Sequence, residues 1–409
     1  MDYYGNKMLH RFEQVILYSE AEYRRRIGAI RQVMAEKGVA VTIFLECAEE
    51  AYDEWLTGRR LLEYVIVPEE GEILGVLWDE FRDETTDISS VDFTRYVTQK
   101  PQEPVFDGIR FINRVPDSRI ADILAASKPE RIGLVLPQQM NAGLADAIAR
   151  KLPKAELVDL TIPVALARAP KSEEELYVIK QARDIQIALY HALPQMLRIG
   201  RDVTDVGNEM TYMLHSMGGS GVVHCGLMCN GPQDVPAPGF GGLRDHKVDY
   251  GDRFFALLES NGPGHHHLAF GRHFVIGEPS KSWEKCVSDA VALHKYAVSL
   301  MKPDSLTLAQ IAVKTRKQAN RMGYTLRESV GWNWMHSLGS YYYEQYSLED
   351  YTENIPLRKD ILLHCHPLIF REFQDSNIRE DLFILNTYHL TEDGAQDLVN
   401  VPMELTVLY

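Results

Sequence analysis

The first part of the chain mixes helical and strand patterns of apolar residues. Its expected elements, in order, are a helix from Ser19 to Gly38, a strand from Val39, a hairpin over residues 64–78, a strand near Ile132, a helix over 142–152 and a strand near Leu157. Ser19 and Glu22 match the capping box that starts a helix, and Gly38 is the residue type that ends one. The mixture of helices and strands predicts one α/β domain over residues 1–165.

The second part of the chain begins with long amphipathic helices and continues with strands and turns. Pro170 and the acidic turn over residues 172–175 predict the start of the first helix, and Leu176 and Ile179 begin its apolar side. Further helices are expected from Thr204 to Gly218, from Lys285 to Met301 and from Thr307. Helices on a largely antiparallel sheet over residues 166–409 would make the whole chain an α+β protein of two domains.

Composition and charge are those of a globular protein with an acidic surface. The 409 residues include 43 basic and 58 acidic side chains, which gives a net charge of -15. This balance supplies no basic stripe for nucleic acid or an anionic membrane. No apolar run reaches the roughly 20 residues of a membrane-spanning helix, and residues 1–14 lack the apolar stretch of a signal peptide. We therefore expect a cytoplasmic protein with no nucleic-acid or membrane partner.

The cysteines indicate neither a disulfide framework nor a zinc motif. They are few, odd in number and irregularly spaced, at Cys47, Cys225, Cys229, Cys286 and Cys365. His224, Cys225 and Cys229 lie close together in sequence, but no second ligand pair follows at a matching spacing. We therefore interpret the two neighbouring cysteines as buried thiols.

Histidine is the residue type whose positions carry chemical information, because its 14 copies fall mostly in the second half and form clusters. A strand over residues 361–370 would place His364 and His366 on one face, where they could bind a metal or move a proton. Periodicity alone favours two histidines satisfied by neighbours on a half-exposed sheet. The triple histidine at residues 265–267 follows a turn sequence, which predicts a solvent-exposed hairpin tip.

An aromatic run surrounds another histidine, His336. Residues 331–346 contain two tryptophans and four tyrosines, side chains that combine a large apolar area with a polar group. Such density is typical of a ligand site or an interface. The candidate substrate-binding residues are Trp332, Trp334, Tyr343, Glu344, His364 and Arg59.

The order of motifs in the second part resembles the creatinase/prolidase superfamily of pita-bread hydrolases. The matching segments are APKSEEELYVIKQARDI, GDRFFALLE, GRHFVIGEP, MHSLG, LRKDILLHCHP, IREDLFIL and TEDGAQDL. Residues 1–165 are similar in layout to the amino-terminal domain of creatinase-like members. The resemblance therefore implies a creatinase-type first domain and a pita-bread second domain over residues 166–409.

The residues that depart from the family pattern carry the functional information. Metallopeptidases of the family hold two divalent ions with two aspartates, one histidine and two glutamates. The resemblance places Leu257, Ala269, His336, His366 and Glu380 at these positions, so only His336 and Glu380 match. A dinuclear aminopeptidase is therefore not implied. Creatine hydrolysis is not implied either, because the catalytic histidine and glutamates of creatinase fall near Ala237 or Pro238, Gly271 and His366.

Three interpretations of this site stay open. We favour a hydrolase of C–N bonds in a small molecule, with His366 and His336 as acid and base, Glu380 as their partner and no cofactor. The second interpretation is a lyase or hydrolase with one divalent transition metal on His336, His366 and Glu380, joined by Glu259 or His267. The third is a catalytically inactive binding module. Loss of both aspartates leaves few anionic ligands, which favours the metal-free enzyme.

The resemblance also implies partners. The substrate is expected to be a small nitrogen-containing molecule. Two-domain members of the family pair so that the first domain of one subunit covers the site of the other, which implies a homodimer. Trp55, Arg59 and Arg60 are the candidates for reaching the neighbouring subunit.

Overall fold

The computed structural model describes residues 17–45, 51–59, 62–77, 106–237, 242–325, 335–336, 357–372 and 379–409, with the backbone alone for 220–225, 335–336 and 379. The chain is α+β, as predicted, and divides into two compact units, Met1–Arg168 and Ala169–Tyr409. Each unit has its own hydrophobic core. The division falls at the end of helix α8 (Thr161–Arg168), and the expected boundary between residues 165 and 166 lies inside that helix.

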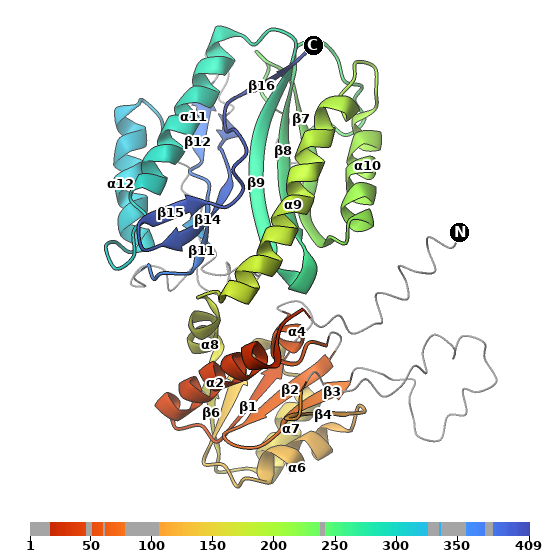
Figure 1. The fold of residues 1–409 in the computed structure, drawn as a ribbon, viewed down its shortest axis with the longest axis vertical. Coiled ribbons are helices and arrows are strands. Elements are labelled where there is room, and N and C mark those ends of the chain that lie inside the picture. The colour runs from red at the N-terminus through yellow and green to blue at the C-terminus, as the bar shows by residue number, and fades with distance from the viewer. Residues whose placement is uncertain are drawn as a thin grey trace, which may run out of the picture. The chain divides into compact units, whose positions relative to one another are not determined.

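The first unit is built on a six-stranded mixed sheet with the strand order β4-β3-β2-β1-β5-β6 (Figure 1). Its strands are β1 (Val41–Leu45), β2 (Leu62–Pro68), β3 (Ile73–Leu77), β4 (Ile109–Ile112), β5 (Arg131–Val135) and β6 (Glu156–Asp159). Its helices are α2 (Glu20–Lys37), α4 (Tyr52–Thr57), the short η2 (Pro137–Gln139), α6 (Asp117–Ala125), α7 (Ala142–Lys151) and α8. The apolar sides of α6 and α7 pack with β1, β2, β3 and β5 in one core.

Local signals fixed the first helix and strand. The Ser19 hydroxyl accepts a hydrogen bond from the Glu22 amide at 3.2 Å, and Gly38 ends the helix in the left-handed conformation with φ of 63°. The predicted hairpin forms as β2 and β3, which pair antiparallel. The predicted start and end of the first helix and the predicted hairpin are therefore confirmed.

Trp55 lies inside the first unit instead of on its surface. Its side chain is 2% exposed. The guanidinium groups of Arg26 and Arg168 lie 5.6 and 5.4 Å from its ring, and a cation over a tryptophan face is a favourable contact. The expectation that Trp55 reaches a partner subunit is therefore wrong. Arg59 lies 5.0 Å from the Phe111 ring, and Arg60 is outside the described residues.

The second unit contains a four-stranded sheet β16-β9-β8-β7, a second four-stranded sheet β10-β11-β14-β15 and the pair β12-β13. Its strands are β7 (Ser220–Pro232), β8 (Asp252–Asn261), β9 (His267–Ile276), β10 (Met335–His336), β11 (Leu362–Cys365), β12 (Ile369–Glu372), β13 (Arg379–Leu382), β14 (Asn386–Thr391), β15 (Gly394–Asp397) and β16 (Thr406–Leu408). Its helices are α9 (Glu173–Met196), α10 (Val203–Ser216), the short η3 (Pro263–His265), α11 (Lys281–Ser299) and α12 (Leu308–Arg321). Most neighbouring strands are antiparallel, as predicted.

The helices of this unit begin at hydrogen-bonded caps. Ser172 opens α9 with a complete capping box, near the predicted position. The cap of α10 is Asp202, whose carboxylate accepts from the Thr204 amide at 2.8 Å, and α11 begins after Ser280 rather than near Lys285. The predicted starts of α10 and α11 were therefore late. Among the described helices, none carries an apolar stretch long enough to cross a membrane.

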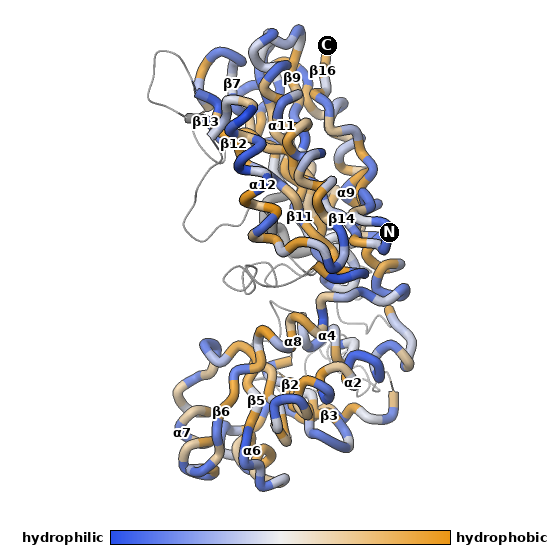
Figure 2. The backbone as a smooth tube through the Cα atoms, turned by 90° about the vertical axis from the view of Figure 1, so that its left-hand side faces the viewer, coloured by the Kyte–Doolittle hydropathy of each residue, from blue (hydrophilic) through white to orange (hydrophobic). Residues whose placement is uncertain are grey.

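Strands β8 and β9 present two different faces. Phe254, Ala256 and Leu258 belong to the outer face, where they pack with the apolar sides of α9 and α10. These two helices lie along one side of the sheet (Figure 1), and hydrophobic segments, in orange, run through this unit (Figure 2). Alternation along the strands puts the intervening residues on the opposite face. We call this set the inner face: Arg253, Phe255, Leu257, Glu259 and Asn261 of β8 with His267, Ala269, Gly271 and His273 of β9.

Candidate functional site

The middle of the inner face is apolar. Leu257 and Ala269 share a buried cluster with Met228, Phe255, Phe383 and Leu385. The rings of Phe255 and Phe383 meet edge to face with their centroids 4.7 Å apart. The two positions that the resemblance assigns to metal-binding aspartates therefore lie in a packed hydrocarbon core.

One end of the inner face carries a buried ion pair. The Arg253 guanidinium donates through Nη1 to both Glu380 oxygens, at 2.7 and 2.9 Å, and Arg371 lies 3.7 Å from the same carboxylate. The Trp283 ring covers both guanidinium groups, at 4.8 Å from Arg253 and 5.2 Å from Arg371. All four side chains are buried. The Glu380 carboxylate is thus held by two cations, an arrangement that suits a structural ion pair.

The other end of the inner face is polar. His267 Nδ1 lies 2.9 Å from the Asn261 side-chain oxygen, and the rings of His267 and His364 are 5.5 Å apart. Glu259 pairs with Ala269 across the strands and so is a diagonal neighbour of His267. Part of the Glu259 side chain stays exposed, while burial raises the pKa of its carboxyl to about 8. A carboxyl that is protonated near neutral pH can act as a general acid.

His366 lies beside the apolar middle of the inner face, in contact with Phe383. The predicted strand over residues 361–370 breaks after Cys365, and His366 lies between β11 and β12. The reason is Pro367, which has no amide hydrogen for a strand ladder. His366 is 5% exposed, and its ring centroid is 5.7 Å from that of Phe383. The prediction of one continuous strand is therefore wrong. The prediction that the two histidines are half-exposed is also wrong, because His364 and His366 are both buried.

The triple histidine is also buried. The predicted turn forms between β8 and β9, yet His265, His266 and His267 have 9%, 0% and 1% of their surface exposed. This end of the hairpin packs on α9: a Cβ on Gly262 would lie 2.2 Å from the Ala182 side chain. The expectation of a solvent-exposed tip is wrong because the helix covers it.

The structure brings some of the predicted site residues together. His336 pairs with His364 between β10 and β11, described here for the backbone only. Glu259, His267 and His364 form the polar end, and Glu380 lies at the ion-pair end. Trp332, Trp334, Tyr343 and Glu344 are outside the described residues. The sequence analysis missed Arg253 as the partner of Glu380. A signal was present, because Arg253 alternates with the apolar residues Phe255 and Leu257 and so shares their inward face of β8.

These residues do not fit a centre that holds two metal ions. Leu257 and Ala269 offer no donor atom, and the Glu380 carboxylate is already bound by Arg253 in two hydrogen bonds. A divalent ion there would meet two guanidinium charges and a hydrocarbon wall, which is the reverse of what hard and borderline cations need.

Solved structures with the same fold define the class of this protein, a two-unit protein whose second unit has the pita-bread fold. A prolidase from Pyrococcus horikoshii has 16% identity and a TM-score of 0.71 over 93% of this chain and 99% of its own. A dipeptidase from Mycobacterium ulcerans has 19% identity and a TM-score of 0.71 over 96% and 99%. An X-Pro aminopeptidase from Thermotoga maritima has 17% identity and a TM-score of 0.69 over 92% and 100%.

The sequence identifies the family itself. Residues 178–392, more than half of the chain, match metallopeptidase family M24. The chain therefore belongs to this family, and the predicted membership of the creatinase/prolidase superfamily is confirmed. No curated protein matches the sequence.

Proposed function

We propose that this protein hydrolyses a C–N bond in a small nitrogen-containing substrate without a dinuclear metal centre. The observation that carries the proposal is the raised pKa of Glu259, on the strand face that ends among histidines and adjoins the apolar middle. Family membership supports hydrolysis of C–N bonds, and the solved relatives are named as prolidases and dipeptidases.

The proposed chemistry is general acid-base catalysis. The imidazole of His366 accepts a proton from water while the water oxygen attacks the carbon of the C–N bond. The Glu259 carboxyl donates a proton to the leaving nitrogen as the C–N bond breaks. His366 then releases its extra proton to solvent and the Glu259 carboxylate takes one up from solvent, which restores the starting state. One water is consumed and no oxidant or reductant is needed. His336 stays a proposed partner of His366. The Glu380 carboxylate is held in position by its hydrogen bonds from Arg253.

His366→Ala is expected to lower turnover by about 10² to 10⁴, the usual contribution of a positioned acid or base. Because the His366 ring is buried against Phe383, the substitution also lowers the thermal midpoint, so turnover is measured well below the midpoint of the variant. The assay screens Xaa-Pro dipeptides and creatine-like or betaine-like compounds with the parent protein first. His389→Ala is the matched control, because His389 lies on β14, partly buried and 3.2 Å from Asp360. Full activity of the His366 variant would remove this residue from the mechanism.

One observation favours a second candidate, a catalytically inactive binding module. A hydrocarbon core and a closed ion pair occupy positions that the family resemblance assigns to metal ligands. Absence of turnover for every compound in the screen, together with saturable binding of one of them, would support the module. The other alternative is a single divalent metal on His336, His366 and Glu380, joined by Glu259 or His267. Elemental analysis of the protein purified without added metal distinguishes it.

We further propose that the protein is a cytoplasmic homodimer, in which Arg59 contributes to the site of the neighbouring subunit. Arg59 is only partly buried, and it stands on the first unit beside Phe111. Sedimentation of the full chain at micromolar concentration should give twice the mass of the 46.6 kDa chain. A species of 46.6 kDa alone would remove Arg59 from the site.

A further inference from the structure

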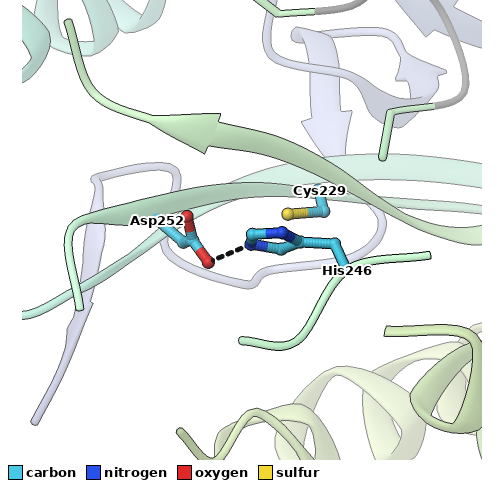
Figure 3. A group of neighbouring side chains, drawn as sticks. All are labelled: Cys229, His246 and Asp252. Atoms are coloured by element: carbon cyan, nitrogen blue, oxygen red, sulfur yellow. Dashed lines mark hydrogen bonds and ion pairs between the residues drawn. The ribbon is translucent and has the colours of Figure 1, made fainter. Parts of the chain in front are cut away.

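A cysteine, a histidine and an aspartate meet on the outer face of the sheet β16-β9-β8-β7 in the second unit. Cys229 comes from β7, His246 from the segment between β7 and β8, and Asp252 is the first residue of β8 (Figure 3). Their possible ligand atoms all lie within 4.8 Å of one another, and His246 Nε2 is 2.7 Å from Asp252 Oδ2. Among the described residues, this is the group of histidine, cysteine and acidic side chains close enough together to hold a metal ion.

The backbone holds Cys229 and the segment that carries His246 side by side. Gly242 has φ of 66°, and a Cβ there would lie 2.7 Å from the Cys229 amide nitrogen and carbonyl oxygen. Only glycine allows this approach without strain. The Leu243 amide then donates to the Cys229 carbonyl at 2.8 Å. The segment is therefore fastened to β7 beside the sulfur.

The other two side chains are also fixed before any ligand binds. The Val203 amide donates to the His246 carbonyl at 2.9 Å, which ties the histidine to the start of α10. The Asp249 amide donates to Asp252 Oδ2 at 2.8 Å, which orients the carboxylate toward the imidazole. Backbone hydrogen bonds therefore hold both residues in place, and a metal ion has to replace only the contact between His246 Nε2 and Asp252 Oδ2.

We propose that Cys229, His246 and Asp252 bind one zinc ion. Sulfur, imidazole nitrogen and carboxylate oxygen are the three donor types that zinc takes in proteins, and three protein ligands leave a fourth position for water. On binding, the Cys229 thiol releases its proton to solvent and its sulfur bonds to the metal, with no change of oxidation state. The His246 side chain is 27% exposed, which gives the ion a route and the water a place.

A thiol nucleophile is a poorer interpretation of the same three residues. Cys229 has 0% of its surface exposed, so an organic substrate cannot reach its sulfur. A metal ion is small enough to enter past His246. Asp252 and Cys229 belong to the outer face of the sheet, with Cys229 in the core shared by α9 and α10, so the zinc site is separate from the proposed hydrolase chemistry.

The test is zinc affinity measured by competition with a chromogenic chelator on the full chain. The parent should bind one zinc per chain. Cys229→Ser, His246→Gln and Asp252→Asn should each weaken binding at least about 100-fold, because even groups that only hydrogen-bond a ligand contribute 10- to 100-fold. Cys286→Ser is the matched control, since Cys286 lies on α11 outside the group, and it should bind as the parent does.

Cobalt replaces zinc as a spectroscopic probe that does not depend on stability. The parent and the Cys286 variant should show a sulfur-to-cobalt charge-transfer band, and the Cys229→Ser variant should lack it while keeping its far-ultraviolet circular dichroism. Zinc should also raise the thermal midpoint of the parent and leave that of Cys229→Ser unchanged. No stoichiometric zinc in the parent, or parent-like affinity in Cys229→Ser, would overturn the proposal.

Discussion

Glu380→Gln is expected to lower the free energy of unfolding by about 3 to 5 kcal/mol, because it leaves the buried Arg253 charge without its partner. Both side chains are almost fully enclosed, and the pair joins β8 to β13 through two hydrogen bonds. Arg371 adds a second positive charge at 3.7 Å, which increases the cost of removing the carboxylate. Urea unfolding followed by circular dichroism measures this change as a lower midpoint at constant slope.

Two further variants show whether charge is the cause. Glu404→Gln removes a surface partner of Lys295, with both side chains more than half exposed, and it should leave the unfolding midpoint where it is. Arg253→Met combined with Glu380→Gln should recover much of the loss, since a buried ion pair can be exchanged for apolar contact. A loss of less than about 1 kcal/mol for Glu380→Gln, the size of an exposed pair, would contradict a structural role.

Glu259→Gln is expected to stabilise the protein above neutral pH while lowering its turnover by about 10² to 10⁴. The folded state raises the pKa of this carboxyl from 4.5 to about 8, so the folded state holds its proton more tightly than the unfolded state. The cost of the buried charge is therefore absent below about pH 4.5, grows as the pH rises, and is complete above about pH 8. Glutamine removes this cost, which is roughly 2 to 5 kcal/mol.

The measurement compares the urea midpoints of the two proteins at pH 5 and pH 8.5. The difference should be small at the lower pH, which is the internal control, and large at the higher. In the parent, kcat/KM should fall above about pH 8 as the general acid loses its proton. Equal stability of the two proteins at both pH values would mean that Glu259 titrates as an ordinary surface carboxyl.

Local chemistry made much of the fold predictable. The helix caps at Ser19, Ser172 and Thr307 are short-range signals, and the structure confirms the helices that they start. The creatinase/prolidase motifs gave the fold of the second unit. The late prediction for α10 has the same origin, because Asp202 and Thr204 are both good caps and only the fold selects between them.

Long-range packing explains what the sequence could not show. Arg253 and Glu380 are 127 positions apart along the chain, and no local pattern indicates that they meet. Burial of His266 depends on α9, which lies far from it along the chain. In the same contact, the Gln186 side chain of α9 donates to the Leu268 carbonyl, 82 positions away. The Cys229 group likewise needed the close approach at Gly242, because its three members have no motif spacing.

The ion pair at Glu380 also constrains how this protein can evolve. A metal ion on Glu380 would require the loss of Arg253, yet loss of Arg253 alone leaves a buried negative charge without that partner. New carboxylates at Leu257 and Ala269 would meet the same hydrocarbon core until a metal arrived. Each single step is therefore selected against through stability before any metal is gained. The salt bridge and the apolar side chains at these positions therefore act together as a barrier, because a metal centre would require several of them to change at once.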